Sequence, residues 1–431
     1  MTPDRTAELI ALDKRHLWHP FTPMRDWMAP EHEPLVLVSG QGAMLRDSEG
    51  REYIDGNSSI WTNIHGHNHP AINEAIREQL GRVAHTSFLG FTNPPAIELG
   101  RELVGIAAPD VLTRVFYSDD GSTAIEVAIK MALQYFQIKG EARRERFVAF
   151  ENGYHGDTLG AASLGGINLF QGRFARYHFP TEHVSSVEDL EALPEPEGIV
   201  AVAIEPLIQG AAGMRPWPSG LLAAVRQWCD RTGVLLIADE VMTAFGRTGT
   251  MFAFQQEGAV PDFLAFAKGL TGGFMPLAAT LTTAKIFEGF QGETFYYGHS
   301  YCGNQMACAA ALASLRIFEE EDVLAGLQTK IAQLTRKLDG LRANPHVREI
   351  RQCGFIAGIE LGGLDGAPLD PMRRAGTQVC IAARKHGLLT RPILDTIVLM
   401  PPLCTTPEQI DQACEAVELA IAEVLGQGSG H

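Results

Sequence analysis

The chain is poor in several features that would place it in a special class of protein. Among its 431 residues there are only seven cysteines, and none of them form a Cys-x-x-Cys pair. An odd number of cysteines without that spacing argues against a disulfide framework and against a cysteine-based metal site. We therefore expect reduced thiols and a cytoplasmic protein.

Long apolar runs and an excess of positive charge are also absent. No stretch of 18 apolar residues occurs, so we expect no membrane-spanning segment. The N-terminus lacks the basic and apolar segments of a secretory signal. The net charge of −16 argues against nucleic acid or an anionic membrane as the main partner.

Lysine is scarce as well, and one lysine stands out. Of the eight in the chain, seven lie in helical or polar contexts, whereas Lys268 ends the apolar run 263–267 and precedes a glycine-rich turn. Burying an ammonium is costly, so such a lysine tends to lose its proton or to form a covalent bond. A neutral amine is a nucleophile for aldehydes, which suggests a Schiff base. Alternatively, Lys268 extends past the strand end into solvent.

What the chain does have is an alternation of apolar strands and helices. The predicted strands are continuous apolar runs, typical of a parallel sheet buried on both faces. Ligands of such sheets bind at the carboxyl ends of the strands. The strands are expected at 115–117, 147–150, 199–204, 234–238, 263–267 and 277–282.

The length of the chain indicates more than one core. We predict an α/β architecture with an N-terminal arm and part of a smaller domain over 1–65, a large domain over 66–318, and a C-terminal small α/β domain over 319–431. The aromatic and proline-rich segment 12–24 predicts an extended, docked arm and not a helix.

A phosphate cradle is predicted where the helix expected over 123–139 begins. Gly121 and Ser122 precede that helix, and Thr123 with Glu126 has the pattern of a capping box. A helix N-terminus with free backbone N–H groups binds phosphate well, although a plain N-cap is the commoner use of such residues.

Two other predicted strands end in groups that suit a flat heterocycle. Tyr154 and His155, between glycines, follow strand 147–150 and either stack on a ligand or only pack. Asp239 follows strand 234–238, and a carboxylate there needs a cation or a protonated nitrogen as its partner. It would hold a pyridine nitrogen protonated, or else it emerges at the surface.

Polar groups elsewhere are weaker candidates. Arg247 and Arg391 are possible carboxylate contacts, and the loop 298–304 is a second possible phosphate contact. His65, His67 and His69 alternate, but no carboxylate or cysteine nearby in sequence completes a metal shell, so we expect no metal.

Together, a phosphate cradle, a stacking aromatic, a strand-end aspartate and a strand-end lysine match the needs of pyridoxal phosphate. The sequence resembles the class III, fold-type I aminotransferases that depend on pyridoxal 5'-phosphate. It is most similar to the branch that converts 8-amino-7-oxononanoate to 7,8-diaminononanoate for biotin. The matching stretches are 16–20, 64–70, 130–135, 152–158, 237–240, 246–249, 268–273 and 399–402.

The resemblance implies a role for each matching residue. Lys268 would be the catalytic, cofactor-bound lysine and Asp239 would bind the pyridine nitrogen. The phosphate would be bound by Gly121 and Ser122, with His299 and Ser300 from the neighbouring subunit of a homodimer. Tyr154 would face both cofactor and substrate. The remaining substrate-site positions are Phe21, Ile60, Trp61, Arg247, Gly298 and Arg391, of which Arg391 would bind the substrate carboxylate.

Two positions bear on the amino donor. The branch that uses adenosylmethionine has a tyrosine where this chain has Phe21, and a tryptophan where it has Ile60. Losing a phenol and an indole removes a hydrogen bond and a stacking plane. A related branch that uses lysine is similar at both places, so the predicted donor is adenosylmethionine or lysine.

Competing interpretations are another class III aminotransferase acting on an ω-amino acid or a diamine, and a dinucleotide-dependent oxidoreductase. The chain lacks a Gly-x-Gly-x-x-Gly motif after a first strand, which argues against the oxidoreductase. A regulatory protein that only binds pyridoxal phosphate would have no reason to keep Lys268.

Overall fold

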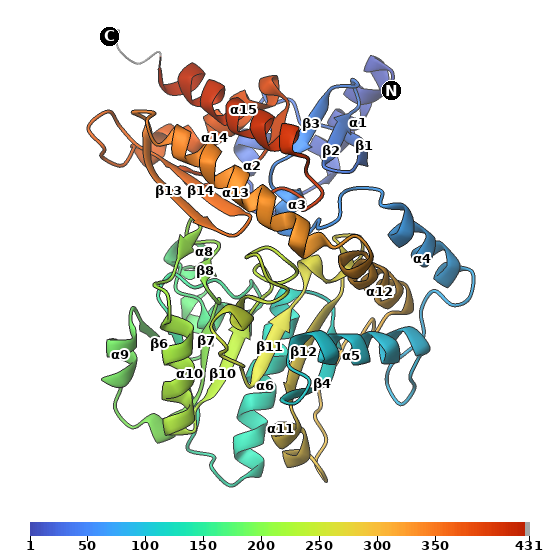
Figure 1. Cartoon of the computed structure of the whole chain (residues 1–431), viewed down its shortest axis with the longest axis vertical. Helices are drawn as coiled ribbons and strands as arrows, with labels where there is room; N and C mark the ends of the chain where they lie inside the picture. The colour runs from blue at the N-terminus through green and yellow to red at the C-terminus, as the bar shows by residue number, and fades with distance from the viewer. Residues whose placement is uncertain (427–431) are drawn as a thin grey trace.

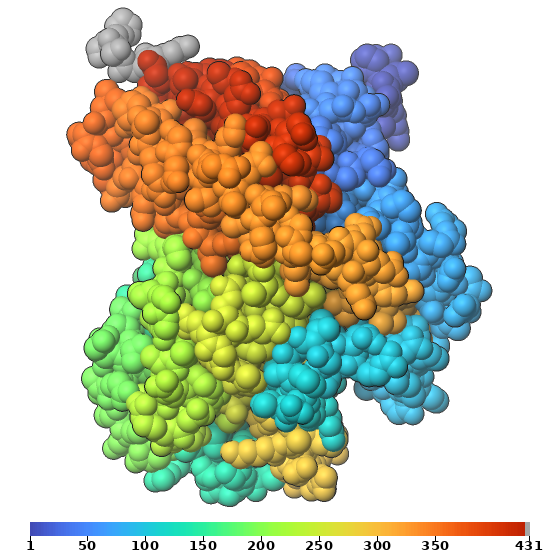
Figure 2. Space-filling model, viewed as in Figure 1, coloured from blue at the N-terminus to red at the C-terminus, as the bar shows by residue number. Residues whose placement is uncertain are grey.

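The computed structural model describes residues 1–426 as two lobes (Figure 1). The lower lobe contains the middle of the chain. In the upper lobe the N-terminal segment and the C-terminal third lie side by side (Figure 2). None of the helices within the described residues combines the length and the apolar character needed to cross a membrane. The boundaries at 65/66 and 318/319 stay predictions.

A seven-stranded sheet forms the centre of the lower lobe, in the order β4-β12-β11-β10-β7-β5-β6. All strands run parallel except β12, which is antiparallel to β4 and β11. The strands are β4 (Leu112–Ser118), β5 (Arg146–Phe150), β6 (Thr181–Val184), β7 (Ile199–Ile204), β10 (Leu235–Asp239), β11 (Phe263–Phe266) and β12 (Ala278–Thr283). The predicted mostly parallel sheet is therefore confirmed.

Both faces of this sheet are buried, which explains the continuous apolar runs. Successive side chains of a strand point to opposite faces. Ala201, Ala203 and Ile237 belong to one cluster, which includes α6 (Gly121–Ile138), whereas Val202 and Leu236 belong to the cluster on the other face. The remaining helices of the lobe are α4 (Pro70–Leu80), α5 (Pro94–Ala107), α7 (Leu159–Leu164), α8 (Asn168–Gln171), α9 (Val187–Glu191), α10 (Leu221–Thr232), α11 (Ala284–Gly289) and α12 (Gln305–Glu320).

Two smaller sheets build the upper lobe. One is antiparallel, in the order β13-β14-β17-β16, and comprises Val347–Cys353, Ile356–Leu361, Thr396–Leu399 and Pro392–Ile393. The other is β1-β2-β3-β15, comprising Leu37–Gln41, Met44–Asp47, Glu52–Asp55 and Leu388–Leu389. In the second sheet β15 pairs with β3, so the C-terminal third of the chain joins the sheet of the N-terminal segment. Helices α13 (Val323–Leu341), α14 (Ala375–Ala383) and α15 (Pro407–Leu425) cover them.

Helix α2 (Met24–Trp27) lies in the upper lobe, where Asp26 pairs with Arg374 and Trp27 bonds to Asp13. Helix α3 (Ser58–Trp61) and a small ribbon that pairs β8 (Ile208–Gln209) with β9 (Arg215–Pro216) lie where the two lobes meet.

The prediction that residues 12–24 are extended is wrong for the first part of that segment. Helix α1 spans Pro3–His16 and only the chain after it leaves the helix. Thr2 caps it by accepting a hydrogen bond from the backbone N–H of Arg5, and the basic side chains of its last turn suit the negative end of the helix dipole. The aromatic and proline-rich residues after the helix led to the prediction of an extended arm.

The predicted start of α6 is also corrected. Asp120, and not Thr123, is the N-cap: its side chain accepts from Thr123 N at 2.9 Å, while Thr123 Oγ1 accepts from Asp120 N at 3.0 Å. Glu126 instead accepts from Thr158 Oγ1 at 2.6 Å. The helix therefore begins earlier than predicted, and Gly121 and Ser122 form its first turn.

Candidate active site

A cavity of about 410 Å³ opens at the carboxyl ends of the central strands. The loops that follow β4, β5, β7, β10 and β11 all contribute to its wall, as parallel strands do in α/β sheets. Six of the residues predicted from the sequence line this one cavity: Trp61, Gly121, Ser122, Tyr154, Asp239 and Lys268.

The first turn of α6 forms one end of the cavity. A Cβ on Gly121 would lie 2.6 Å from Val241 Cγ1, and one on Gly156 would lie 2.2 Å from Ser122 Oγ. A side chain at either glycine would therefore fill the space at the N-terminus of α6, which the two glycines leave open. The N–H groups of such a turn carry partial positive charge and suit a phosphate.

Asp239, the last residue of β10, is buried against the cavity. His155 Nδ1 lies 2.7 Å from Asp239 Oδ2, and His155 is also buried. Burial by itself would lower the pKa of His155, but the hydrogen bond and the negative charge of Asp239 outweigh it and raise the pKa. The histidine thus holds the carboxylate in place at the cavity wall.

Glu205 is a second buried carboxyl group on this wall. Its Oε1 accepts from Gly210 N at 2.9 Å and its Oε2 from Tyr154 N at 3.1 Å. Burial raises the pKa of Glu205 to about 7, against the opposing effects of His155 and the two N–H groups. Glu205 follows β7 as Asp239 ends β10, so the same strand-end signal would have identified it in the sequence.

Lys268 follows β11, and its amine faces Trp61. The Nζ lies 5.3 Å from the centre of the indole ring, and no hydrogen bond or ion pair engages it within residues 1–426. Removal from water lowers the pKa of Lys268, while Asp239 and Glu205 act in the opposite direction. Its φ of 36° is strained for a residue with a Cβ. The amine is therefore held inward, and burial shifts its protonation equilibrium toward the neutral form.

A chain of aromatic rings leads away from the cavity. Tyr154 donates to Asp157 Oδ2 at 2.7 Å, and its ring meets Phe170 edge-on at 5.9 Å. Phe170 in turn meets Phe21 at 5.7 Å. Phe21 itself is mostly exposed and does not line the cavity. Nothing in the sequence around Phe170 predicts this contact, which depends on the packing of distant segments.

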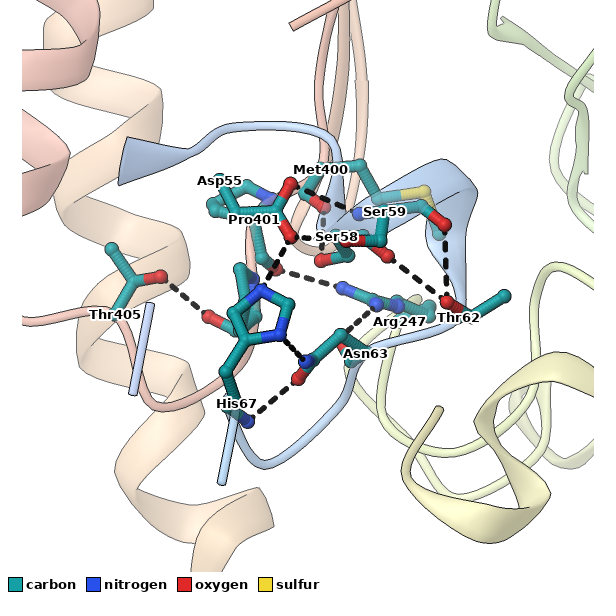
Figure 3. A network of polar contacts seen from close by, with 12 residues as sticks. Asp55, Ser58, Ser59, Thr62, Asn63, His67, Arg247, Met400, Pro401 and Thr405 are labelled. Atoms are coloured by element: carbon teal, nitrogen blue, oxygen red, sulfur yellow. Dashed lines mark hydrogen bonds and ion pairs between the residues drawn. The ribbon is translucent and has the colours of Figure 1, made fainter. Parts of the chain in front are cut away.

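Arg247 is fully buried between the lobes and is not in the cavity wall. One guanidinium nitrogen donates to Asn63 O and another to Pro401 O, both at 2.7 Å (Figure 3). Burial lowers the pKa of Arg247 to about 9, with Asp55 acting in the opposite direction. The structure gives it a role in joining the two lobes, and contact with a substrate stays a prediction.

The other predicted site residues lie outside this wall. Arg391, after β15, is exposed, and within the described residues no hydrogen bond or ion pair engages it. Ile60 is partly exposed beside Trp61. His299 Nδ1 lies 3.1 Å from Asp119, which lines the cavity, so the segment containing Gly298 and Ser300 runs close to the cavity.

The three alternating histidines have three different partners. His65 bonds to Ser314 at 2.9 Å, His67 to Asp55 at 2.9 Å and His69 to Glu321 at 3.3 Å. They do not converge on a common point.

The residues of the cavity fit pyridoxal phosphate at three chemically distinct ends. The open turn of α6 suits the phosphate, the buried carboxylate of Asp239 suits a protonated ring nitrogen, and the amine of Lys268, whose pKa is lowered by burial, suits the aldehyde.

Comparison with known proteins identifies the family. A model described as aminotransferase class III matches residues 27–421. The chain belongs to the class III aminotransferases. It is 48% identical, over 99% of its length and 83% of the relative's, to the adenosylmethionine-8-amino-7-oxononanoate aminotransferase of Nitratidesulfovibrio vulgaris.

Solved structures of an aminotransferase and a transaminase agree with this membership. The crystal structure of adenosylmethionine-8-amino-7-oxononanoate aminotransferase from Methanocaldococcus jannaschii has a TM-score of 0.93 at 40% identity, covering 97% of this chain and 99% of that one. A PLP-bound amine transaminase from an uncultivated Pseudomonas species has a TM-score of 0.90 at 34% identity, covering 95% and 98%. This class III aminotransferase therefore has the predicted fold-type I architecture and uses pyridoxal 5'-phosphate.

We expect borohydride treatment of the holoenzyme to attach the cofactor permanently to Lys268, because Lys268 lies in the cavity wall. Peptide mapping by mass spectrometry locates the label. Lys268→Ala should not be labelled, and its activity should fall by about 10²–10⁴-fold. Lys285→Ala, which removes an exposed lysine, should keep the label and the activity. A label on another lysine would contradict this assignment.

Glu205→Gln should make stability less dependent on pH. The pKa of Glu205 is about 7 in the folded protein against 4.5 in the unfolded chain. Between these values the folded state holds a proton that the unfolded chain has lost, so this carboxyl destabilises the protein progressively as the pH rises through that window. The free energy of unfolding of the holoenzyme, measured in urea, should fall between pH 5.5 and pH 8 by about 1–3 kcal/mol more in the parent than in Glu205→Gln.

Glu78→Gln, on an exposed carboxyl, is the matched control and should show no such difference from the parent. An equal pH response of the parent and Glu205→Gln would contradict the raised pKa.

Proposed function

We propose that this enzyme transfers an amino group to 8-amino-7-oxononanoate and forms 7,8-diaminononanoate in biotin biosynthesis. The observation that carries the proposal is the 48% identity over 99% of the chain with a relative named for that reaction. The shared backbone of the Methanocaldococcus jannaschii enzyme supports it further. A cytoplasmic location stays a prediction with this role.

The cavity residues would hold the cofactor as its chemistry requires. Bound pyridoxal phosphate acts as an electron sink that stabilises negative charge on the carbon next to the amine. Gly121 and Ser122 would bind the phosphate through the first turn of α6, and Asp239, fixed by His155, would keep the ring nitrogen protonated. The ring of Tyr154 would flank the cofactor.

Lys268 would perform the proton transfer. Its burial favours the neutral amine, which can accept a proton at Nζ from the substrate carbon and return it elsewhere. The carboxylates of Asp239 and Glu205 stabilise the ammonium that forms when Nζ accepts this proton. Two half-reactions, first with the donor and then with the keto acid, would give ping-pong kinetics.

The substrate would meet residues from both lobes. Trp61 and Tyr154 line the cavity, while Arg391 has an exposed guanidinium suited to bidentate binding of the substrate carboxylate. Arg247 and Gly298 stay predicted substrate contacts, and neither lines the cavity.

For the donor we propose adenosylmethionine or lysine. The Phe21–Phe170–Tyr154 ring chain supports a donor site that extends outward from the cavity. A phenylalanine at position 21 offers a ring edge but no hydroxyl to a polar donor. Ile60 likewise offers no ring beside Trp61, which favours lysine over a donor that needs stacking.

The alternative is transamination of an ω-amino acid or a diamine by a class III aminotransferase. The structural likeness to an amine transaminase, at 34% identity, favours considering it.

We also propose a homodimer in which His299 and Ser300 approach the partner's phosphate site. Exposed apolar side chains support it: Leu89 and Phe91 are each 72% exposed and Tyr296 is 90% exposed. The segments carrying them are neighbours, since a Cβ on Gly298 would lie 3.9 Å from Leu89. An exposed apolar patch of this kind is typical of a protein interface.

Incubation of the purified holoenzyme with 8-amino-7-oxononanoate and one donor at a time tests the function. We expect 7,8-diaminononanoate, detected by mass spectrometry, with lysine or adenosylmethionine. Phe21→Tyr should shift kcat/KM toward adenosylmethionine by about tenfold, because it adds a hydrogen bond worth about 1.4 kcal/mol. If neither donor gives 7,8-diaminononanoate while ω-amino acids or diamines are turned over, the alternative is favoured.

Sedimentation analysis tests the dimer. The parent chain should sediment as a dimer, and Phe91→Asp should produce monomers with weakened cofactor binding, because a charge replaces an apolar contact. Leu364→Asp, at an exposed apolar residue in the upper lobe, is the control and should remain dimeric. A parent monomer with full activity would contradict the proposal.

A further inference from the structure

The segment that delivers Trp61 to the cavity has an unusual backbone. Ser58, Ser59, Ile60 and Trp61 have φ values of 45°, 50°, 65° and 68°, so α3 is a single left-handed turn. Trp61 N donates to Asn57 O at 2.8 Å, which closes the turn. Left-handed backbone is unfavourable for every residue with a Cβ, and most of all for a β-branched one such as Ile60. Such strain persists only where the surroundings hold it.

The turn has a consequence at the cavity. It places the indole of Trp61 in the wall, with the Nζ of Lys268 5.3 Å from the ring centre. The indole also lies close to Gly210, where a Cβ would be 3.4 Å from Trp61 Cζ3. A right-handed turn over the same residues would direct the indole elsewhere.

A buried carboxylate holds the start of this turn. Asp55, the last residue of β3, accepts from Ser59 N at 2.9 Å and from Ser59 Oγ at 2.8 Å (Figure 3). Its Oδ2 also lies 2.9 Å from His67 Nε2. Ser58 Oγ donates to Met400 O at 2.6 Å, which ties the turn to the upper lobe.

Hydrogen-bond logic assigns the tautomer of His67. Gly66 N donates to Asn63 Oδ1 at 2.7 Å, which orients that amide and directs its NH₂ group at His67 Nδ1, 3.0 Å away. Nδ1 must therefore accept, and the ring proton lies on Nε2, where it is donated to Asp55. Asn63 O also accepts from Arg247, so the end of the turn is fixed as firmly as its start.

We propose that Asp55, His67 and Asn63 are positioning residues that hold the left-handed turn 58–61 and thereby set the place of Trp61 above Lys268. They do not line the cavity and act through Trp61. The kinetic consequence for the donor rests on the proposed function, whereas the conformational consequence does not.

Two substitutions at His67 separate the proposal from a general packing role. The side-chain amide of Gln reaches the position of Nε2 and can still donate to Asp55, whereas Asn reaches only the position of Nδ1. Hydrogen exchange of the holoenzyme, followed by mass spectrometry, should show amides 59–63 of His67→Asn exchanging at least about tenfold faster than the parent. His67→Gln should resemble the parent, and so should the control His69→Asn, whose parent side chain bonds to Glu321.

In kinetics, His67→Asn should raise the KM of the donor about tenfold while kcat changes by less than about threefold, since the lysine itself is untouched. Unchanged exchange at 59–63, or equal damage by Gln and Asn, would overturn the proposal. If the parent and all the variants are inactive toward 8-amino-7-oxononanoate, the proposed substrate is refuted, but the exchange result still tests the positioning role.

A second pair tests the strain even if His67→Asn does not fold. Glycine adopts positive φ without penalty, so Ile60→Gly should have a higher Tm than Ile60→Ala. In a right-handed helix the order is reversed. A Tm for Ile60→Ala equal to or above that of Ile60→Gly would show that the turn is not held under strain.

Discussion

The structure depends on withdrawing one amine from bulk water close to two buried carboxyl groups. Lys268 loses its hydration at the end of β11, and the charges of Asp239 and Glu205 only partly compensate for that loss. Each carboxyl group is itself satisfied by neighbours: His155 bonds to Asp239, and the backbone of Tyr154 and Gly210 bonds to Glu205. Because these partners come from different loops, the chemistry of the amine is linked to the order of the whole sheet.

The sheet makes this arrangement possible because β7, β10 and β11 are adjacent and parallel. Their carboxyl ends meet at one edge, so strand-end residues far apart in sequence become neighbours. The first turn of α6 adds positive backbone dipoles at the same edge. A buried sheet is rigid, which keeps these groups within the small tolerances that proton transfer requires.

Around this rigid edge the chain stores backbone strain. Lys268 and the four residues 58–61 have positive φ, and Arg247 fixes the second of these segments by bonding to carbonyl oxygens of Asn63 and Pro401. The bonds cross between the lobes, so the position of Trp61 depends on how the lobes pack (Figure 3). Strain of this kind is commonly retained at functional sites because the surrounding contacts over-determine it.

Local patterns in the sequence were enough to predict the apolar strands, the polar groups at their ends and the start of α6 to within a turn. Six predicted site residues do line one cavity. Local capping signals also specified α1, although the aromatic segment after it obscured them. Only the tertiary structure paired His155 with Asp239, brought Glu205 beside Lys268, joined Phe21 to Tyr154 through Phe170 and buried Arg247 between the lobes. The physical reason is that propensity and periodicity act over a few residues, whereas these contacts follow from strand order and lobe packing.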